Sequence, residues 1–379
     1  MVFLSMAARL EVNVEALNAV ETVGNVVKHR RAPMVIPTES GYRLVYVPAV
    51  SGEAVANAYQ RALVEYAKII YRTANLTPPL TPWDERHEFV KFMDDAHLTN
   101  KLKAIVQSAQ SAKSKSDVTY IISLKHDFEK TAITESLVAD IGGFLFAKDE
   151  LPVKRTSRFY CGYVLPVYDA IDVTAIEAQI HARHVPTETW RREKEQEKGG
   201  QQSDKAEERR AQAQMLYYVE VASGIYGLTL AIDLSGIGVT SLVKVEKALN
   251  FDERLRRVKV ALAALQALFT GVGFGAKLTR FTPVKRVISA VATVTHPLPF
   301  MVHPPQVKGY VQETVNRLLK FRGYAKNSLK VELDSKAVVY GESVTATEQQ
   351  VVTVAESLED FFDTLAGTAI DLYTKYEKD

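Results

Sequence analysis

Residues 271–280 read Gly-Val-Gly-Phe-Gly-Ala-Lys-Leu-Thr-Arg, and the predicted fold is organised around this stretch. It follows a long amphipathic pattern and precedes an apolar one, so it joins a predicted helix to a predicted strand. Its three glycines in five residues let a ligand approach the backbone closely, and Lys277 and Arg280 place two cations beside them. Such a loop suits a polyanion, although a plain glycine-rich turn fits the same residues. No nucleotide-binding motif matches, because Leu278 stands where a Walker loop has serine or threonine, and a dinucleotide loop would open a helix.

The segments on either side of this loop predict an α+β fold. Residues 251–269 carry apolar side chains at helical spacing, and residues 287–294 form an apolar strand. Upstream, residues 217–221 and 225–232 are predicted to form a hairpin across residues 222–224. Strand, strand, helix, glycine loop and strand make up the second half of a ferredoxin-like unit.

The first third of the chain supplies the other half of that unit. Residues 10–14 alternate between apolar and polar side chains, which predicts a half-buried strand. A loop over 17–33 follows, then a hairpin formed by 34–36 and 42–47. A helix over 52–72 completes the half.

Five further segments are distinct in character. Residues 80–135 are polar and helix-leaning, which predicts an inserted subdomain, and residues 175–184 predict a strand. Residues 187–214 are dense in charges of both signs and cannot build a core, so they project from the body as an arm or form a disordered loop. Helices over 307–322 and 349–374 are predicted to close the chain.

Composition narrows the classes of function. The chain has 379 residues and 47% of them are apolar, enough for a sizeable core. A formal net charge of +2 excludes a generally basic nucleic-acid coat, so an anion site must come from local clustering. The single cysteine, Cys161, excludes a disulfide framework and a cysteine-rich zinc site. No stretch approaches the roughly 20 apolar residues of a membrane span, and the first ten residues lack a charged signal-peptide start. We therefore expect a soluble, cytoplasmic protein that contacts no membrane.

Two more segments combine cations with polar or aromatic residues. Lys28, His29, Arg30 and Arg31 follow one another, which fits contacts to phosphates and bases or, alternatively, a solvated loop tip. Residues 151–163 hold cations beside three aromatic residues, which fits phosphate contact with base stacking or a strand edge with core aromatics. The cations of this second segment are Lys154, Arg155 and Arg158.

The histidines do not predict a metal site. His181 and His184 have the separation of two ligands on a helix, but in a strand they point to opposite faces. Neither a cysteine nor a pair of carboxylates lies near them in the sequence.

Five motifs, taken in order, resemble one known family, the archaeal type I-A CRISPR-associated backbone subunit of the Cascade surveillance complex. This is a DevR-type member of the repeat-associated RNA-binding superfamily, and the resemblance covers about residues 10–300. The motifs are Leu17-Asn18-Ala19-Val20-Glu21 with Gly24-Asn25 and Lys28-His29-Arg30; residues 47–54; Gly142-Gly143-Phe144; residues 152–158; and Phe274-Gly275-Ala276-Lys277 with Arg280-Phe281 and Pro283.

The resemblance implies a modified ferredoxin-like, RNA-recognition-motif palm with a helical insertion and a thumb-like hairpin. On this chain the palm would be discontinuous, over 1–79, 136–182 and 214–379. The insertion would be residues 80–135, and the thumb residues 183–213.

The resemblance also implies a function in which copies stack head to tail along the spacer part of a CRISPR RNA and hold its backbone. The base edges then remain free to pair with target DNA. Further implied partners are the other type I-A Cascade subunits, namely the guide 5′-end-binding subunit, the small subunit, and the nuclease and helicase subunits. No catalytic residue, metal or cofactor is implied. The residues implied to contact RNA are Asn18, Asn25, Lys28, His29, Arg30, Lys154, Arg155, Arg158, His181, Lys277 and Arg280.

Two other functions compete with this interpretation. Related backbone subunits of type III complexes cut target RNA with a loop aspartate and a metal; here loop 17–31 contains Glu21 but no aspartate, and the insertion offers the adjacent pair Asp94-Asp95. A sequence-specific DNA-binding regulator would need a basic recognition helix. The helix over 251–269 has four cations, but its apolar stripe predicts core packing with a solvated edge.

Overall fold

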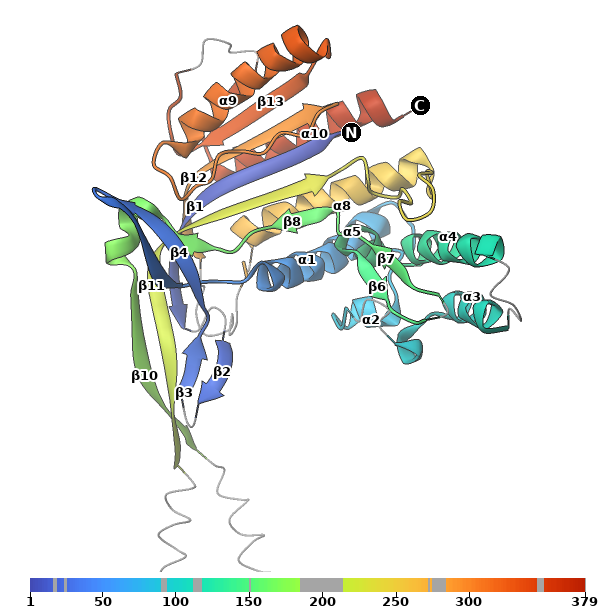
Figure 1. Cartoon of the computed structure of the whole chain (residues 1–379), viewed down its shortest axis with the longest axis horizontal. Coiled ribbons are helices and arrows are strands. Elements are labelled where there is room, and N and C mark those ends of the chain that lie inside the picture. Colours follow the sequence, from blue (N-terminus) through green and yellow to red (C-terminus); the bar gives the residue numbers. More distant parts are fainter. Residues whose placement is uncertain are drawn as a thin grey trace, which may run out of the picture.

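The computed structural model of the chain describes residues 1–15, 19–23, 26–89, 94–111, 118–149, 151–184, 214–271, 273–274, 284–345 and 351–378. Within them a central sheet carries helices on both faces (Figure 1). This mixed architecture confirms the predicted α+β class. None of the helices described is long and apolar enough to cross a membrane.

Five neighbouring strands form the main part of the sheet and are mostly antiparallel. They are β1 (Phe3–Glu15), β11 (Gln214–Asp233), β12 (Val284–His296), β13 (Asp334–Tyr340) and β14 (Val352–Ala355). Their order across the sheet is β14-β13-β12-β1-β11. Strand β1 pairs along most of its length with both β11 and β12, and the only parallel pair of the five is β13 with β14. All residues of β1 from Phe3 to Leu10 are buried, which matches its central place, because the sheet is covered on both faces there.

Strand β11 carries further strands along both of its edges. On the edge shared with β1, β3 (Val26–His29) runs parallel to it and β2 (Ala19–Val23) pairs with β3. The opposite edge holds β10 (Ala175–His184), β9 (Leu165–Pro166) and β8 (Phe159–Cys161), all antiparallel to β11. The strand predicted over 175–184 is thereby confirmed.

The hairpin predicted across residues 222–224 is wrong, because β11 runs unbroken through them. Gly224 pairs with Val12 of β1, and Ser223 pairs with Ala175 of β10. A Cβ atom on Gly224 would lie 2.6 Å from Oγ1 of Thr174, so glycine is needed here for close approach of the neighbouring chain. Close approach and tight turns have the same glycine signature in a sequence.

Three helices cover one face of the sheet. They are α1 (Gly52–Thr73), α8 (Phe251–Thr270) and α10 (Leu358–Glu377). Each begins at a residue whose side chain accepts a hydrogen bond from the first turn, namely Ser51, Asn250 and Ser357. The predicted starts of the first two helices are therefore confirmed.

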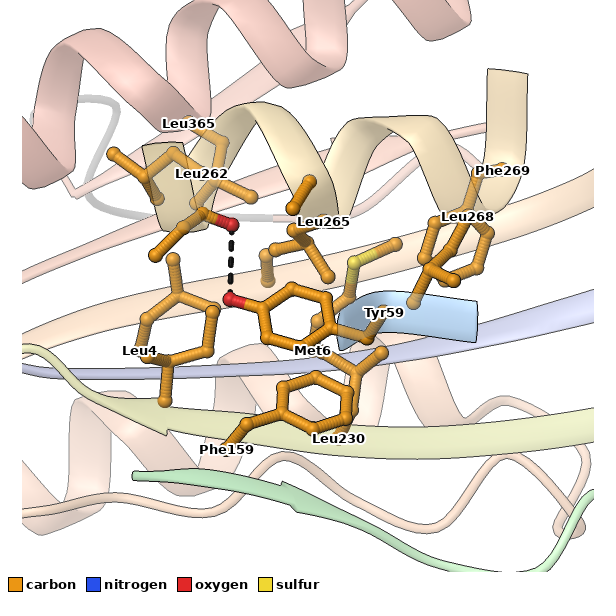
Figure 2. Packing of buried hydrophobic residues seen from close by; sticks show 14 of the residues in the cluster. Leu4, Met6, Tyr59, Phe159, Leu230, Leu262, Leu265, Leu268, Phe269 and Leu365 are labelled. Atoms are coloured by element: carbon orange, nitrogen blue, oxygen red, sulfur yellow. Dashed lines mark hydrogen bonds between the residues drawn. The ribbon is translucent and has the colours of Figure 1, made fainter. Parts of the chain in front are cut away.

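The main core lies between these helices and the sheet. Leu4 and Met6 of β1 point into it, as Figure 2 shows. Tyr59 of α1 is fully buried there, its ring stacked on Phe159 with 3.9 Å between the ring centres. Its hydroxyl donates to the carbonyl oxygen of Ala261 at 3.0 Å, which ties α1 to α8.

The other face of the sheet is covered by α9 (Tyr310–Tyr324), which continues into a π-helical turn, η3 (Ala325–Leu329). Their apolar side packs on β12 and β13. The helix predicted over 349–374 is wrong in its first part, since β14 precedes α10. The β-branched run at 351–354 favours a strand there.

The segment between α1 and β8 contains several short elements around a second core. The helices are α2 (Pro82–Glu85), η1 (Asp95–His97), α3 (Asn100–Ser111), α4 (Val118–Glu135) and α5 (Leu137–Gly142), and the strands are β6 (Phe144–Phe146) and β7 (Val153–Arg155). Phe128 of α4 stacks on Phe146 at the centre of this core. Gly143 has φ +71°, and a Cβ atom there would lie 2.5 Å from the carbonyl oxygen of Arg155, so only glycine fits between α5 and β6.

The predicted hairpin near residue 40 is confirmed as β4 (Arg31–Thr38) and β5 (Gly41–Pro48). One side of it packs through Met34, Ile36 and Val47 next to β9 and the short helix η2 (Tyr168–Val173). The opposite side, here called the outer hairpin face, is apolar and exposed. Its side chains are Val35, Tyr42, Leu44 and Tyr46, with exposed fractions of 53, 81, 58 and 68%.

Candidate nucleic-acid interface

A cluster of cations lies where β3 passes into β4, beside the edge of β11. Lys28 is exposed at the end of β3. Arg30 is half-buried, and its Nη1 donates to the hydroxyl of Tyr163 at 3.5 Å. Arg31 is exposed and pairs with Glu220 of β11, with 3.4 Å between Nη2 and Oε1. We call Lys28, Arg30 and Arg31 the basic cluster; it presents more positive than negative charge to solvent.

His29 lies within the same run but faces inward. Its side chain is buried, its Nδ1 donates to the carbonyl oxygen of Arg30 at 2.8 Å, and its backbone N–H donates to Glu220 at 2.9 Å. Burial lowers the pKa of His29 below its usual 6.5, so the ring is neutral at neutral pH. The expectation that this side chain is a phosphate-binding cation is therefore corrected: His29 fixes β3 against β11.

Arg155 is not at the surface at all. Its guanidinium is fully buried and pairs with Asp140 at 2.5 Å and with Glu129 at 3.2 Å. It also donates to the carbonyl oxygens of Gly236 and Val239. The assignment of Arg155 to an RNA interface is therefore wrong, because the alternation of side chains along β7 turns this residue into the protein.

Asp140 connects this arginine to a larger buried network. It accepts a hydrogen bond from Nη1 of Arg257 at 2.8 Å and from the backbone N–H of Gly238 at 3.0 Å. Arg254, one helical turn before Arg257 in α8, is also buried and pairs with Glu377 at 2.7 Å. These two arginines correct the prediction of a solvated cationic edge on α8 in part, since Lys259 is exposed and Arg256 half-buried.

The remaining cations of the second segment differ in exposure. Arg158 is mostly buried and its Nη1 lies 3.2 Å from Asp233, so much of its charge is already matched. Lys154 is exposed on β7, on the side opposite Arg155. It belongs to the small β6–β7 sheet, whereas Lys28 lies in the main sheet and Arg31 in the β4–β5 hairpin. Lys154 is therefore the cation of this segment that is presented to solvent.

Other residues of the predicted interface fall partly or wholly outside the described residues. His181 lies in β10, opposite Tyr217 of β11. Asn18, Asn25, Lys277 and Arg280 are outside the described residues, as are residues 185–213 of the predicted thumb. Of the glycine-rich loop, Gly271 ends α8 and Phe274 is buried in the main core.

The adjacent aspartates of the insertion are engaged with other groups. Asp94 begins η1, accepting hydrogen bonds from the backbone N–H and the Nδ1 of His97. Asp95 pairs with Lys148 at 2.9 Å. Within the part of the chain that the structure describes, no three His, Cys, Asp or Glu residues are placed to hold a metal ion.

The sequence matches identify the family. A family model described as CRISPR-associated negative auto-regulator DevR/Csa2 matches residues 6–315. The chain belongs to the DevR/Csa2 family. The resemblance seen in the five motifs is thereby confirmed, and the basic cluster, Lys154 and His181 all lie inside the matched range of this DevR/Csa2 protein.

Relatives of this DevR/Csa2 chain come from several archaea. A CRISPR-associated aCascade subunit Cas7/Csa2 of Saccharolobus solfataricus is 34% identical over 362 residues, covering 94% of this chain and 97% of the relative. A CRISPR-associated protein Cas7/Cst2/DevR of Methanocaldococcus jannaschii is 27% identical over 358 residues, 94% of this chain and 100% of the relative. Chains from two solved CRISPR RNA-guided surveillance complexes, one of them pre-nicking, each cover 97% of this chain and 99% of their own length, with TM-scores of 0.46 and 0.43 at 11% identity.

Proposed function

We propose that this chain binds the spacer portion of a CRISPR RNA through its backbone and stacks head to tail with further copies, as the helical backbone of a type I-A antiviral surveillance complex. The observation that carries the proposal is the basic cluster, in which exposed cations stand beside Tyr163 on the rim of a sheet. Cations on a surface contact phosphates, and an aromatic ring beside them can stack on a sugar or base. Such a surface holds a strand without reading its sequence.

The proposed interface follows from which side chains are available. Lys28, Arg30 and Lys154 stay in it as exposed or half-buried cations, with Arg31 added. Asn18, Asn25, His181, Lys277 and Arg280 stay in it as residues implied by the family. Arg155 leaves it, and His29 and Arg158 act by supporting their neighbours. The protein has no catalytic role in this proposal; target DNA pairs with the bases of the guide, and the other subunits of the complex are the guide 5′-end-binding, small, nuclease and helicase subunits.

The strand order supports a ferredoxin-like palm. Four antiparallel strands lie in the order β12-β1-β11-β8. In the chain, α1 lies between β1 and β8, and α8 lies between β11 and β12. This is the β-α-β-β-α-β arrangement, with the helices of the α3–α4 region as an insertion that has its own core.

The outer hairpin face supports self-assembly. Val35 lies opposite Leu44, and Pro33 and Pro37 lie opposite Tyr46 and Tyr42. This face has no charged side chain between residues 33 and 37 or at 42, 44 and 46, whereas the core of a protein interface is apolar and rich in tyrosine. We assign it to a second copy, because the hairpin begins at Arg31 of the basic cluster. A neighbour seated on it would lie next to the RNA that the cluster holds, and a head-to-tail contact of this kind makes a filament.

The test is RNA binding by the Lys28→Ala/Arg30→Ala variant across salt concentrations. The slope of log affinity against log salt is negative. If both cations contact phosphates, its magnitude should decrease by about 1.4, since each phosphate contact to a single strand contributes about 0.7. The matched control is Lys103→Ala/Lys259→Ala, which removes two exposed lysines from α3 and α8. RNAs of one length and different sequence should bind alike.

Two results would count against the proposal. One is equal slopes for the variant and the control. The other is a large preference for one RNA sequence at fixed length. Separately, metal-dependent cleavage of complementary RNA that Asp95→Ala abolishes would replace the non-catalytic assignment with a nuclease.

A further inference from the structure

The end of α9 and the turn η3 form a segment whose charges are all positive, outside the basic cluster. Residues 315–331 contain five cations and no carboxylate, although the whole chain balances 47 lysine and arginine residues against 45 carboxylates. The cations are Arg317, Lys320, Arg322, Lys326 and Lys330. The family match ends at residue 315, so this segment lies outside it.

Packing turns these cations outward. Val315, Leu318 and Ala325 are fully buried toward the sheet, which anchors α9 and η3 just before the charged run and within it. Lys320, Lys326 and Lys330 are exposed as a result. In Figure 1 α9 lies at the end of the molecule opposite β3, so these cations form a surface separate from the basic cluster.

Aromatic rings are interleaved with the cations. The guanidinium of Arg317 lies over the ring of Phe300, 5.3 Å from its centre. Phe300 is followed by Phe321 at 5.6 Å and then by Tyr324 at 6.4 Å, measured between ring centres. Tyr324 is 51% exposed, so the row of rings reaches the surface between Lys320 and Lys326.

The lysines of this surface differ from other lysines of the protein. Lys130, Lys148, Lys244 and Lys375 each pair with a carboxylate. Among the described residues no ion pair involves Lys320, Lys326 or Lys330. Their charge is therefore available to a ligand.

We propose that this surface, made of Arg317, Lys320, Arg322, Lys326, Lys330 and Tyr324 and here called the α9 basic face, binds the sugar–phosphate backbone of a second nucleic-acid strand. At about 1.5 Å per helical residue, its cations extend over roughly 20 Å. One strand of a duplex presents a phosphate about every 3.4 Å of axis, so roughly six phosphates face this length. Lysine is depleted in interfaces between proteins, which makes a polyanion the better fit. The exposed ring of Tyr324 can stack on a base of a single strand.

The test compares the triple variant Lys320→Gln/Lys326→Gln/Lys330→Gln with a triple control, Lys103→Gln/Lys125→Gln/Lys259→Gln, which loses the same charge from α3, α4 and α8. Affinity of the full chain for a 30-base-pair duplex DNA is measured at several salt concentrations. In the α9 variant the magnitude of the slope of log affinity against log salt should be about 2.7 smaller than in the control, at about 0.9 for each lost contact. Thermal unfolding of both variants checks that the fold is kept.

Further probes identify the strand. Single-stranded DNA and RNA are measured in parallel, and the expected loss of slope is about 2.1 with single strands. If a single strand is the ligand, Tyr324→Ser should weaken the binding of single strands without changing the slope and should leave duplex binding unaffected.

Slopes that match the control for all three nucleic acids would overturn the proposal. The proposal would also be overturned if the α9 variant lost as much binding to phosphatidylserine vesicles as to nucleic acid, because the face would then bind anions without preference for nucleic acid. The Lys28→Ala/Arg30→Ala variant in the same assay separates this surface from the guide interface, since either effect can vanish without the other.

Discussion

At the scale of single residues, Asp140 is the centre of the buried charge network. It neutralises Arg155 of β7 and Arg257 of α8, and both guanidiniums are excluded from solvent. These contacts join α5 and the nearby β7 to α8, whose Arg257 lies 117 residues from Asp140 in the sequence. Removing one partner of a buried ion pair is costly because the other charge remains buried without compensation.

We therefore expect Asp140→Asn to lower the free energy of unfolding by about 3–5 kcal/mol. Urea denaturation at neutral pH measures this. Asp95→Asn is the control, because its pair with Lys148 is exposed and is expected to contribute no more than about 1 kcal/mol. A loss for Asp140→Asn no larger than that of the control would show that the network does not stabilise the fold.

The same residues mark the limit of prediction for the site. A run of cations in a sequence indicates an anion site, and Lys28 and Arg30 are indeed presented to solvent. Arg155 belongs to an equally basic run, yet its two carboxylate partners lie 15 and 26 residues away. No local sequence pattern distinguishes an exposed cation that can bind a ligand from one that pairs with carboxylates of the same chain. Tyr163 joins Arg30 across 133 residues, so only the folded chain brings them together.

At the scale of elements, β11 is the strand on which most of the sheet depends. It contacts β1 and β3 on one edge and β8, β9 and β10 on the other. Gly224 lies inside it, where Thr174 leaves no room for a side chain.

Gly224→Ala should destabilise the protein by about 1–3 kcal/mol, the usual cost of inserting a carbon into a packed site. In a Thr174→Ala background, which removes Oγ1 and Cγ2, the same substitution should cost clearly less. Thermal or urea unfolding of the four proteins in this double-mutant cycle measures the coupling. Strictly additive effects would mean that the contact with Thr174 is not what requires glycine.

Helices and strands whose apolar residues recur at regular spacing could be predicted from the sequence, and elements without such spacing could not. The helices α1 and α8, the β4–β5 hairpin and β10 follow from apolar spacing and from their capping or turn residues. Strands β13 and β14 were missed because they are short and lie between strong helical patterns. The break predicted in β11 failed because pairing with strands far away in the sequence, and not the local glycine, decides whether the chain turns.

At the scale of the whole molecule, assembly is expected to depend on the outer hairpin face. Tyr42→Ser/Tyr46→Ser changes two exposed side chains, so the thermal midpoint of the isolated chain should stay within a few degrees of the parent. Binding to an RNA long enough for one copy should also be unchanged. On a longer RNA, sedimentation velocity should show smaller particles than the parent forms, because the contact between copies is lost.

The control for assembly is Val245→Ser, which removes an equally exposed apolar side chain from the loop before α8. Particles of parental size with the tyrosine variant would assign the outer hairpin face to a partner other than a second copy. Particles reduced equally by both variants would mean that any exposed apolar residue contributes.

The unbroken run of β11 has a mechanical consequence. Its register with β10 is continuous from Gln214 to Ser223, and its register with β1 is continuous from Val221 to Asp233, so the two ladders overlap. A force applied at Gln214 along the strand axis would therefore load the hydrogen bonds of both ladders together, in shear. In a hairpin the same force would break the hydrogen bonds one after another. The strand would therefore transmit tension applied at Gln214 directly to its pairing with β1 in the centre of the sheet.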